Sequence, residues 1–162
     1  MAATGAIILR WLIRAVQWLF FDQGERLGAA VTGSWADRLH LLLAPAIGMV
    51  VVSWMVRRWA PEAQGHGVPE VQYAIRKLGG RIRTRVAAVK AVASAISIGS
   101  GGSVGREGPI VQIGSSLGST VGQAAGLGPG QTRIMVAAGA AGAIGATFNA
   151  PIAGVMFAME VI

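Results

Sequence analysis

Long apolar runs separated by short polar intervals dominate this sequence. The runs cover Leu39 to Met55, Val86 to Ile98, Ile110 to Leu127 and Ile134 to Ile162. A helix needs roughly 20 apolar residues to cross a bilayer, and 53% of the residues are hydrophobic while only 13% are charged. Soluble domains rarely have such a composition. The sequence therefore predicts an all-α, polytopic membrane protein with about four to six helical segments, some of which do not span fully.

Basic residues in the polar intervals indicate how the chain is oriented. The net charge is +7, and seven Arg and Lys residues lie between positions 57 and 85. The positive-inside rule places this interval in the cytoplasm and the earlier loop, Asp22 to Arg38, outside. The alternative, a nucleic-acid patch, is disfavoured because one Tyr and four Phe provide little surface for base stacking. We expect the lipid bilayer as a partner and no nucleic acid.

Composition also argues against metal chemistry. The chain has no cysteine, and its two histidines, His40 and His66, are too few for a metal cluster. We expect no metal, no other cofactor and no catalytic site.

The first hydrophobic segment, Ala6 to Phe21, carries Arg10 and Arg14 on one helical face. It is too polar for the apolar region of a secretory signal. Two interpretations remain open. The helix spans the bilayer with its arginines facing protein or water, or it lies in the interface as an amphipathic helix.

Glycines repeat every four residues in the third apolar run, at Gly114, Gly118, Gly122 and Gly126. Consecutive small residues at this spacing form one stripe on a helix and let another backbone approach closely. We expect this stripe to pack against a neighbouring helix. The alternative is a flexible loop, but interleaved Ile, Val and Leu residues favour a helix.

Two glycine-rich breaks interrupt the apolar pattern, and each leads into a proline that suits the first turn of a helix. The first is Gly65 to Glu70, and the second is Gly101 to Pro109. The unpaired N–H groups at a helix N-terminus bind anions. Within a membrane, irregular backbone survives only where protein buries it or where it lines an aqueous cavity. The two breaks therefore predict an anion site.

The motifs at these breaks resemble those of the CLC family of chloride channels and chloride/proton exchangers. The resemblance is carried by Gly105 to Pro109 (GREGP), Val111 to Gly114 (VQIG) and Phe148 to Gly154 (FNAPIAG), and Gly65 to Pro69 falls where that family has its GSGIP motif. It extends over essentially all of the chain from the first hydrophobic segment onward. It implies the first inverted-repeat half of a CLC-type channel fold.

The resemblance assigns roles to individual residues. Glu107 is similar to the family's gating glutamate, whose carboxylate competes with chloride for a helix N-terminus. The alternative role is that of a simple helix-capping acid. The remaining candidate anion-binding residues are Gly65, His66, Gly67, Val68, Pro69, Gly105, Arg106, Gly108 and Pro109.

The sequence departs from the family pattern at two positions. His66 replaces the serine of GSGIP, so either its imidazole donates to the anion or the ring turns away and the amides act alone. Val161 follows Glu160, where exchangers of the family typically have two consecutive glutamates. Since valine carries no proton, this departure favours passive, channel-like conduction.

Lys90 is the one charge in the apolar run Val86 to Ile98. Two roles are open for it: its ammonium raises the potential along an anion path, or it pairs with a carboxylate or with helix-end carbonyls.

We expect residues 1–162 to be a partial CLC-type transmembrane domain that lacks the second repeat half. The resemblance implies passive transport of chloride or a similar anion across a plasma or inner membrane, with a homodimer in the full-length parent. A chloride/proton antiporter is the first alternative. A non-conducting fragment or structural membrane subunit is the second.

Overall fold

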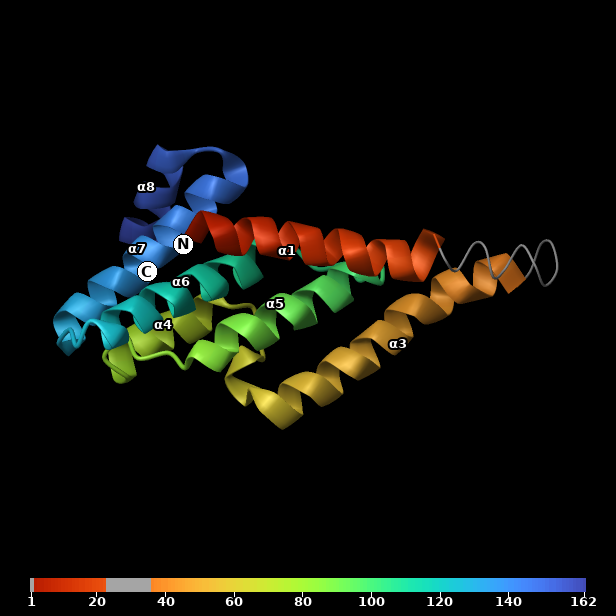
Figure 1. Cartoon of the computed structure of the whole chain (residues 1–162), viewed down its shortest axis with the longest axis horizontal. Helices are drawn as coiled ribbons and strands as arrows, with labels where there is room; N and C mark the ends of the chain where they lie inside the picture. Colours follow the sequence, from red (N-terminus) through yellow and green to blue (C-terminus); the bar gives the residue numbers. More distant parts are fainter. Residues whose placement is uncertain (1, 23–35) are drawn as a thin grey trace.

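The computed structural model describes residues 2–22 and 36–162, and these ranges are helical throughout apart from short connections. The α-helices are α1 (Ala2–Gln17), α3 (Ala36–Trp59), α4 (Val68–Lys77), α5 (Thr84–Gly99), α6 (Glu107–Ala124), α7 (Pro129–Phe148) and α8 (Pro151–Val161) (Figure 1). A π-helical turn, η1 (Trp18–Asp22), extends α1, and a 3-10 turn, η2 (Pro61–Ala63), follows α3. Most of the loop that the sequence places outside lies beyond the described residues.

The predicted number of helical segments, four to six, is too low, because these ranges contain seven α-helices. The last apolar run divides at Asn149, which has a left-handed backbone with φ 53°, and Pro151 then begins α8. The short helix α4, whose start Pro69 indicates, is not among the apolar runs, because its apolar residues occupy only one face. Both α4 and α8 are too short to cross a bilayer, in accord with the expectation of partially spanning helices.

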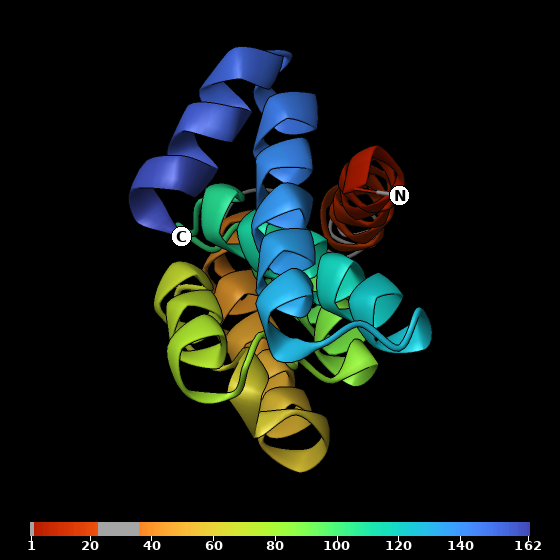
Figure 2. The same ribbon diagram turned by 90° about the vertical axis from the view of Figure 1, so that its left-hand side faces the viewer.

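The closest helix packing lies between α6 and α7, which Figure 2 shows crossing near the centre of the molecule. A Cβ atom at Gly114 would overlap the carbonyl oxygen of Gly139, and one at Gly118 would overlap that of Met135. Gly122 faces Thr132 in the same seam. These three glycines let the two backbones touch, which is the arrangement that the four-residue spacing predicts.

Gly126 does not belong to this seam, and its assignment to helix packing is wrong. It follows the end of α6 with φ +65°, and a Cβ there would meet no atom within 4 Å. Its amide donates to the carbonyl of Gln123. Gly126 therefore caps the C-terminus of α6, a position that glycine favours because it has no Cβ penalty in the left-handed region.

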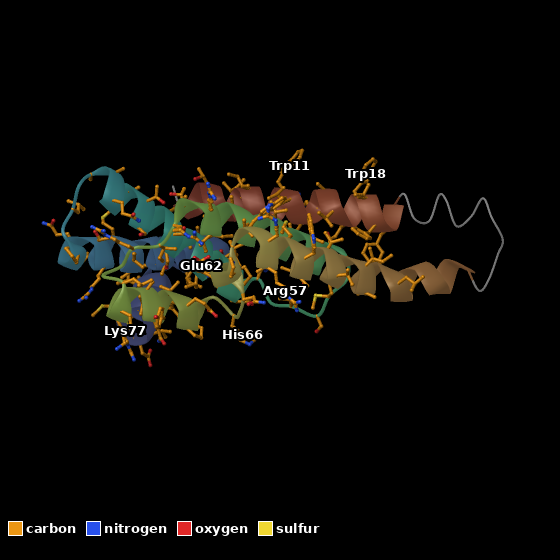
Figure 3. The ribbon with its side chains drawn as sticks, turned by 90° about the horizontal axis from the view of Figure 1, so that it is seen from below. Trp11, Trp18, Arg57, Glu62, His66 and Lys77 are labelled. Atoms are coloured by element: carbon orange, nitrogen blue, oxygen red, sulfur yellow. The ribbon has the colours of Figure 1, made fainter. Side chains whose placement is uncertain are left out.

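Helix α5 is packed between α1 and α3 (Figure 1). The outer surface is apolar: Trp11 and Trp18 project away from the bundle (Figure 3), and Ile152 and Met159 of α8 are also exposed. Among the described helices, residues 4–21 form the one segment that is long and apolar enough to cross a membrane by length and composition alone.

Candidate functional site

The two glycine-rich breaks meet through their backbones. A Cβ at Gly108 would overlap the carbonyl oxygen of His66, and a Cβ at Gly67 would overlap the carbonyl oxygen of Gly108. Gly67 also has φ +102°, a conformation that side chains disfavour. Only glycine at both positions permits this contact. The structure thus brings together the N-terminal ends of α4 and α6, which lie about 40 residues apart in the sequence.

The amide of Gly67 is bonded within the chain. Its N–H donates to Oε2 of Glu70 at 2.7 Å, so the Glu70 carboxylate caps the N-terminus of α4. An acid in the first turn of a helix is stabilised by the helix dipole and by the unpaired amides. This role of Glu70 was missed from the sequence, although its position in the first turn after Gly67 and Pro69 is typical of such a cap.

Glu107 is the first residue of α6, and its side chain is exposed. The carboxylate folds back over the chain, because a Cβ at Gly105 would overlap its Oε2. Arg106 precedes the helix with an exposed side chain, whereas Pro109 is buried in the first turn. Glu107 therefore sits as a flexible acid at a helix N-terminus, where negative charge is favoured.

A cavity of about 750 Å³ joins the two breaks. Its wall includes Gly65, His66 and Val68 from the first break, and Gly105 and Glu107 from the second. The His66 ring is exposed and projects from the ribbon in Figure 3. Six of the nine candidate anion-binding residues therefore border one shared space, whereas Gly67, Pro69 and Arg106 do not line it.

Polar side chains of α5 form another part of this wall. Lys90, Ser94 and Ser97 line the cavity and lie three or four residues apart, on one helical face. Lys90 was predicted from the sequence as a candidate, whereas the two serines were missed. Their shared spacing with Lys90 is the signal that could have found them. Hydroxyl groups at this position are suitable donors to an anion.

Lys90 holds the segment that leads into the first break. Its Nζ donates to the carbonyl oxygens of Ala63 at 2.9 Å and Gly65 at 2.8 Å, and the residue is only 6% exposed. Of the two roles left open, the structure shows pairing with carbonyls. The ammonium also lines the cavity.

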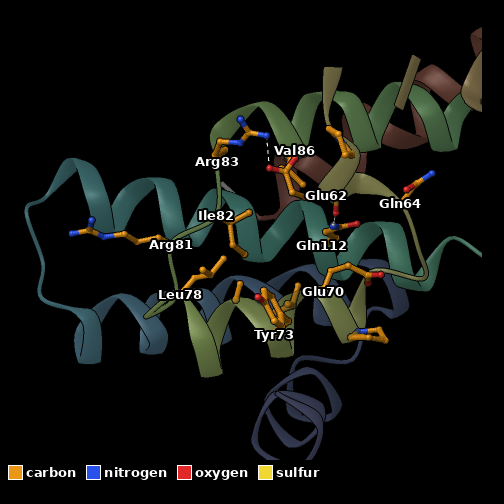
Figure 4. A pocket seen from close by; sticks show the side chains of 14 residues that line it. Glu62, Gln64, Glu70, Tyr73, Leu78, Arg81, Ile82, Arg83, Val86 and Gln112 are labelled. Atoms are coloured by element: carbon orange, nitrogen blue, oxygen red, sulfur yellow. Dashed lines mark hydrogen bonds and ion pairs between the residues drawn. The ribbon is translucent and has the colours of Figure 1, made fainter. Parts of the chain in front are cut away.

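A second pocket, of about 620 Å³, lies on the other side of η2 (Figure 4). Gln112 reaches it from α6 and donates through Nε2 to the carbonyl of Glu62 at 3.0 Å. Glu62 also pairs with Arg83 across the pocket mouth (Figure 4). The Gln112 bond anchors η2, and with it the start of the first break, to α6, and the Arg83 pair ties η2 to the start of α5.

Val161 lies at the end of α8 beside α4. The side chain of Gln72 donates through Nε2 to the carbonyl oxygen of Val161. Glu160 is exposed. The position at which the family's exchangers typically have a second acid therefore presents an apolar side chain and a neutral amide partner.

Broken helices that direct their N-terminal ends at a common cavity, inside an apolar helical bundle, are characteristic of integral membrane transport proteins. The chain belongs to the voltage gated chloride channel (CLC) family, since the model of that family matches residues 48–162. This match confirms the resemblance drawn from the motifs.

Individual relatives agree with the family match. The H(+)/Cl(-) exchange transporters ClcA of Salmonella arizonae and Salmonella newport are each 38% identical to the chain over 153 residues. These alignments cover 91% of this chain and 31% of each relative. The chain thus spans about a third of the length of the curated relatives that it matches.

Solved structures agree on the fold. The crystal structure of a eukaryotic CLC transporter matches 99% of this chain and 31% of its own, with a TM-score of 0.79 and 21% identity. The structure of a slow cyanobacterial Cl-/H+ antiporter matches 96% of this chain and 38% of its own, with a TM-score of 0.69 and 27% identity. The all-α, CLC-type half predicted from the sequence is therefore confirmed.

Proposed function

We propose that residues 1–162 form the first inverted-repeat half of a CLC-type transmembrane domain that moves chloride in exchange for protons. The observation that carries this proposal is Glu107: a protonatable carboxylate at the N-terminus of α6, beside a cavity that also contains the start of α4. The names of the ClcA relatives support exchange over the passive conduction that Val161 favours.

In this mechanism the Glu107 carboxylate and a chloride ion compete for the same electropositive helix end. When the carboxylate is ionised, it occupies the site and blocks the path. When it takes up a proton, its attraction to the helix N-terminus falls and chloride replaces it. Each passage of chloride is thereby linked to the protonation of one side chain.

The anion is held by partial charges and hydroxyl groups more than by a dedicated cation. The first-turn amides of α4 and α6, with Ser94 and Ser97, line the cavity, while the Lys90 ammonium is shared with two carbonyl oxygens. Weak coordination of this kind lets an ion enter and leave. Because Gly67 donates to Glu70, we propose that the amides of His66 and Val68 serve the anion at this helix end.

The test is proton movement driven by chloride in liposomes that contain the full-length gene product. An outward chloride gradient should drive protons inward, against a proton gradient, as read by a pH dye. Glu107→Gln should keep chloride flux and abolish proton movement, because the amide cannot take up a proton. Flux of chloride without proton movement in the wild type would refute exchange.

Passive conduction is the second candidate, and Val161 is the observation that favours it. A protein of this kind would carry chloride in the same assay with no proton coupling, and Glu107→Gln would raise its flux. The absence of any anion flux would instead support the structural-subunit alternative. We further propose a plasma or inner membrane location and a homodimeric assembly, in line with the family.

A further inference from the structure

Helix α1 brings two arginines to the loop that precedes α6, and Figure 1 shows the course of α1 along the bundle. Arg10 and Arg14 lie on one face of α1 and line a hollow of about 500 Å³. The facing wall includes Arg106 and Glu107. The described side chains around this hollow therefore carry three guanidinium groups and one carboxylate.

The position of the hollow explains how α1 accommodates its two charged side chains. Arg10 and Arg14 belong to the segment 4–21, which is long and apolar enough to cross a membrane. Charged side chains in such a segment are costly unless they face protein or water. Arg10 donates to the carbonyl oxygen of Thr147 at 3.2 Å, near the C-terminus of α7, where a cation is favoured. Arg14 is the sharper probe of the hollow, because Arg10 also holds α7.

The hollow adjoins the cavity described above. Val104, Gly105 and Glu107 line both spaces. An anion in the hollow is therefore separated from the shared cavity by the Glu107 side chain and the loop before it. Guanidinium groups exposed to water attract anions without trapping them, and a wall whose net charge is positive raises the local anion concentration.

We propose that this hollow is an additional binding site for chloride or a similar small inorganic anion, in which Arg14, with Arg10 and Arg106, concentrates the ion ahead of Glu107. The site rests on the proposed function, since it supplies the ion that Glu107 admits. It differs from the helix-end site in its chemistry: whole charges on side chains hold the ion loosely, and no dehydration is required.

The test compares Arg14→Gln with Arg14→Lys, which keeps the charge, in the full-length gene product. Arg133→Gln is the matched control, because Arg133 is an exposed arginine of α7 that does not line the hollow. Chloride uptake into liposomes is measured as a function of chloride concentration. Gluconate replaces chloride, so that the ionic strength stays constant and low. Chloride titration of the purified proteins by calorimetry gives binding independently of transport.

Arg14→Gln should raise the chloride concentration for half-maximal uptake by about twofold, the effect of one charge at roughly 8 Å in water. The increase should shrink at high ionic strength, because salt screens exposed charges. Arg14→Lys and Arg133→Gln should behave as the wild type. An unchanged value in Arg14→Gln, or an equal rise in Arg14→Lys, would overturn the proposal.

The calorimetric arm separates failure of this site from failure of the proposed function. If the wild type carries no chloride, the transport proposal fails. Chloride binding that weakens in Arg14→Gln would still support the hollow as an anion site. Chloride binding that is equal in both proteins, or undetectable in the wild type, would refute it.

Discussion

The start and the middle of α6 use glycine for the same kind of backbone contact, but the contact has a different effect at each place. In the middle of the helix, Gly114 and Gly118 lie against backbone carbonyls of α7, and at its start Gly108 lies against the carbonyl of His66. In the middle of both helices the amides are already used by helical hydrogen bonds, so the contact contributes packing alone. At the start, the contact brings two helix N-termini, with their spare amides, to one cavity.

This comparison teaches that a glycine is functional or structural according to the backbone that it brings close. Where that backbone has no free hydrogen-bonding group, the glycine stabilises the bundle. Where that backbone has a free hydrogen-bonding group, the glycine helps to form a binding site. Substitutions at the start and in the middle of α6 should therefore separate effects on transport from effects on stability.

The largest effect is expected at the seam. Gly118→Val should lower the free energy of unfolding by about 3 kcal/mol, because its side chain collides with the backbone of Met135 and forces α6 and α7 apart. Unfolding in SDS, followed by circular dichroism, measures this. Gly130→Ala is the control, since a Cβ there meets nothing within 4 Å. An unchanged free energy of unfolding in Gly118→Val would contradict the packing role of the glycines in the middle of α6.

Lys90→Met tests whether Lys90 holds the segment that leads into the first glycine-rich break. The change removes the donor to the carbonyls of Ala63 and Gly65, and a buried acceptor left unpaired costs about 2 kcal/mol. The free energy of unfolding in SDS and the rate of chloride uptake should both decline. Lys77→Met, at an exposed lysine of α4, should change stability by about 0.5 kcal/mol or less. Equal losses in the two variants would argue against a special role for Lys90.

Gly108→Ala should affect transport more than folding. The added methyl group collides with the His66 carbonyl and separates the two breaks. We expect chloride turnover to fall about tenfold, which corresponds to about 1.4 kcal/mol. The rate per folded protein is measured in liposomes, with Gly128→Ala, at an open position, as the control. A decline that merely follows the amount of folded protein would contradict a role in the site.

The smallest effect is expected at the far end of α6. Gly126→Ala should lower the free energy of unfolding by about 1 kcal/mol, because alanine disfavours φ +65°. Gly126→Asn should lose less, since asparagine accepts the left-handed conformation more readily. SDS unfolding of both variants decides between a cap and a packing role. If Gly126 had a packing role, the larger asparagine would lower the free energy of unfolding more than alanine does.

The sequence predicted those features that depend on local pattern. The apolar runs indicated α5 and α6, the proline after each glycine-rich break indicated a new helix, and the spacing of Gly114 to Gly122 indicated the seam with α7. Motif resemblance then added the family. These signals are local, so one sequence carries them.

Features that depend on a distant partner could not be predicted in this way. Periodicity alone extended the glycine stripe to Gly126, although α6 ends before it. The partners of Lys90 lie more than 20 residues away, so its two roles stayed open. The capping of Gly67 by Glu70 was missed because the break was interpreted as an anion site, and an acid of the chain competes for the same amide.

The interlocked backbones beneath Glu107 have a consequence for timing. Since Gly108 is wedged against the first break, α6 cannot slide to carry the acid in and out of the path. In the proposed mechanism the carboxylate would instead change place by rotation about its own carbon–carbon bonds, a motion of exposed side chains that takes picoseconds to nanoseconds. A slow cycle would then reflect the arrival of protons and ions, and not the swing of the acid itself.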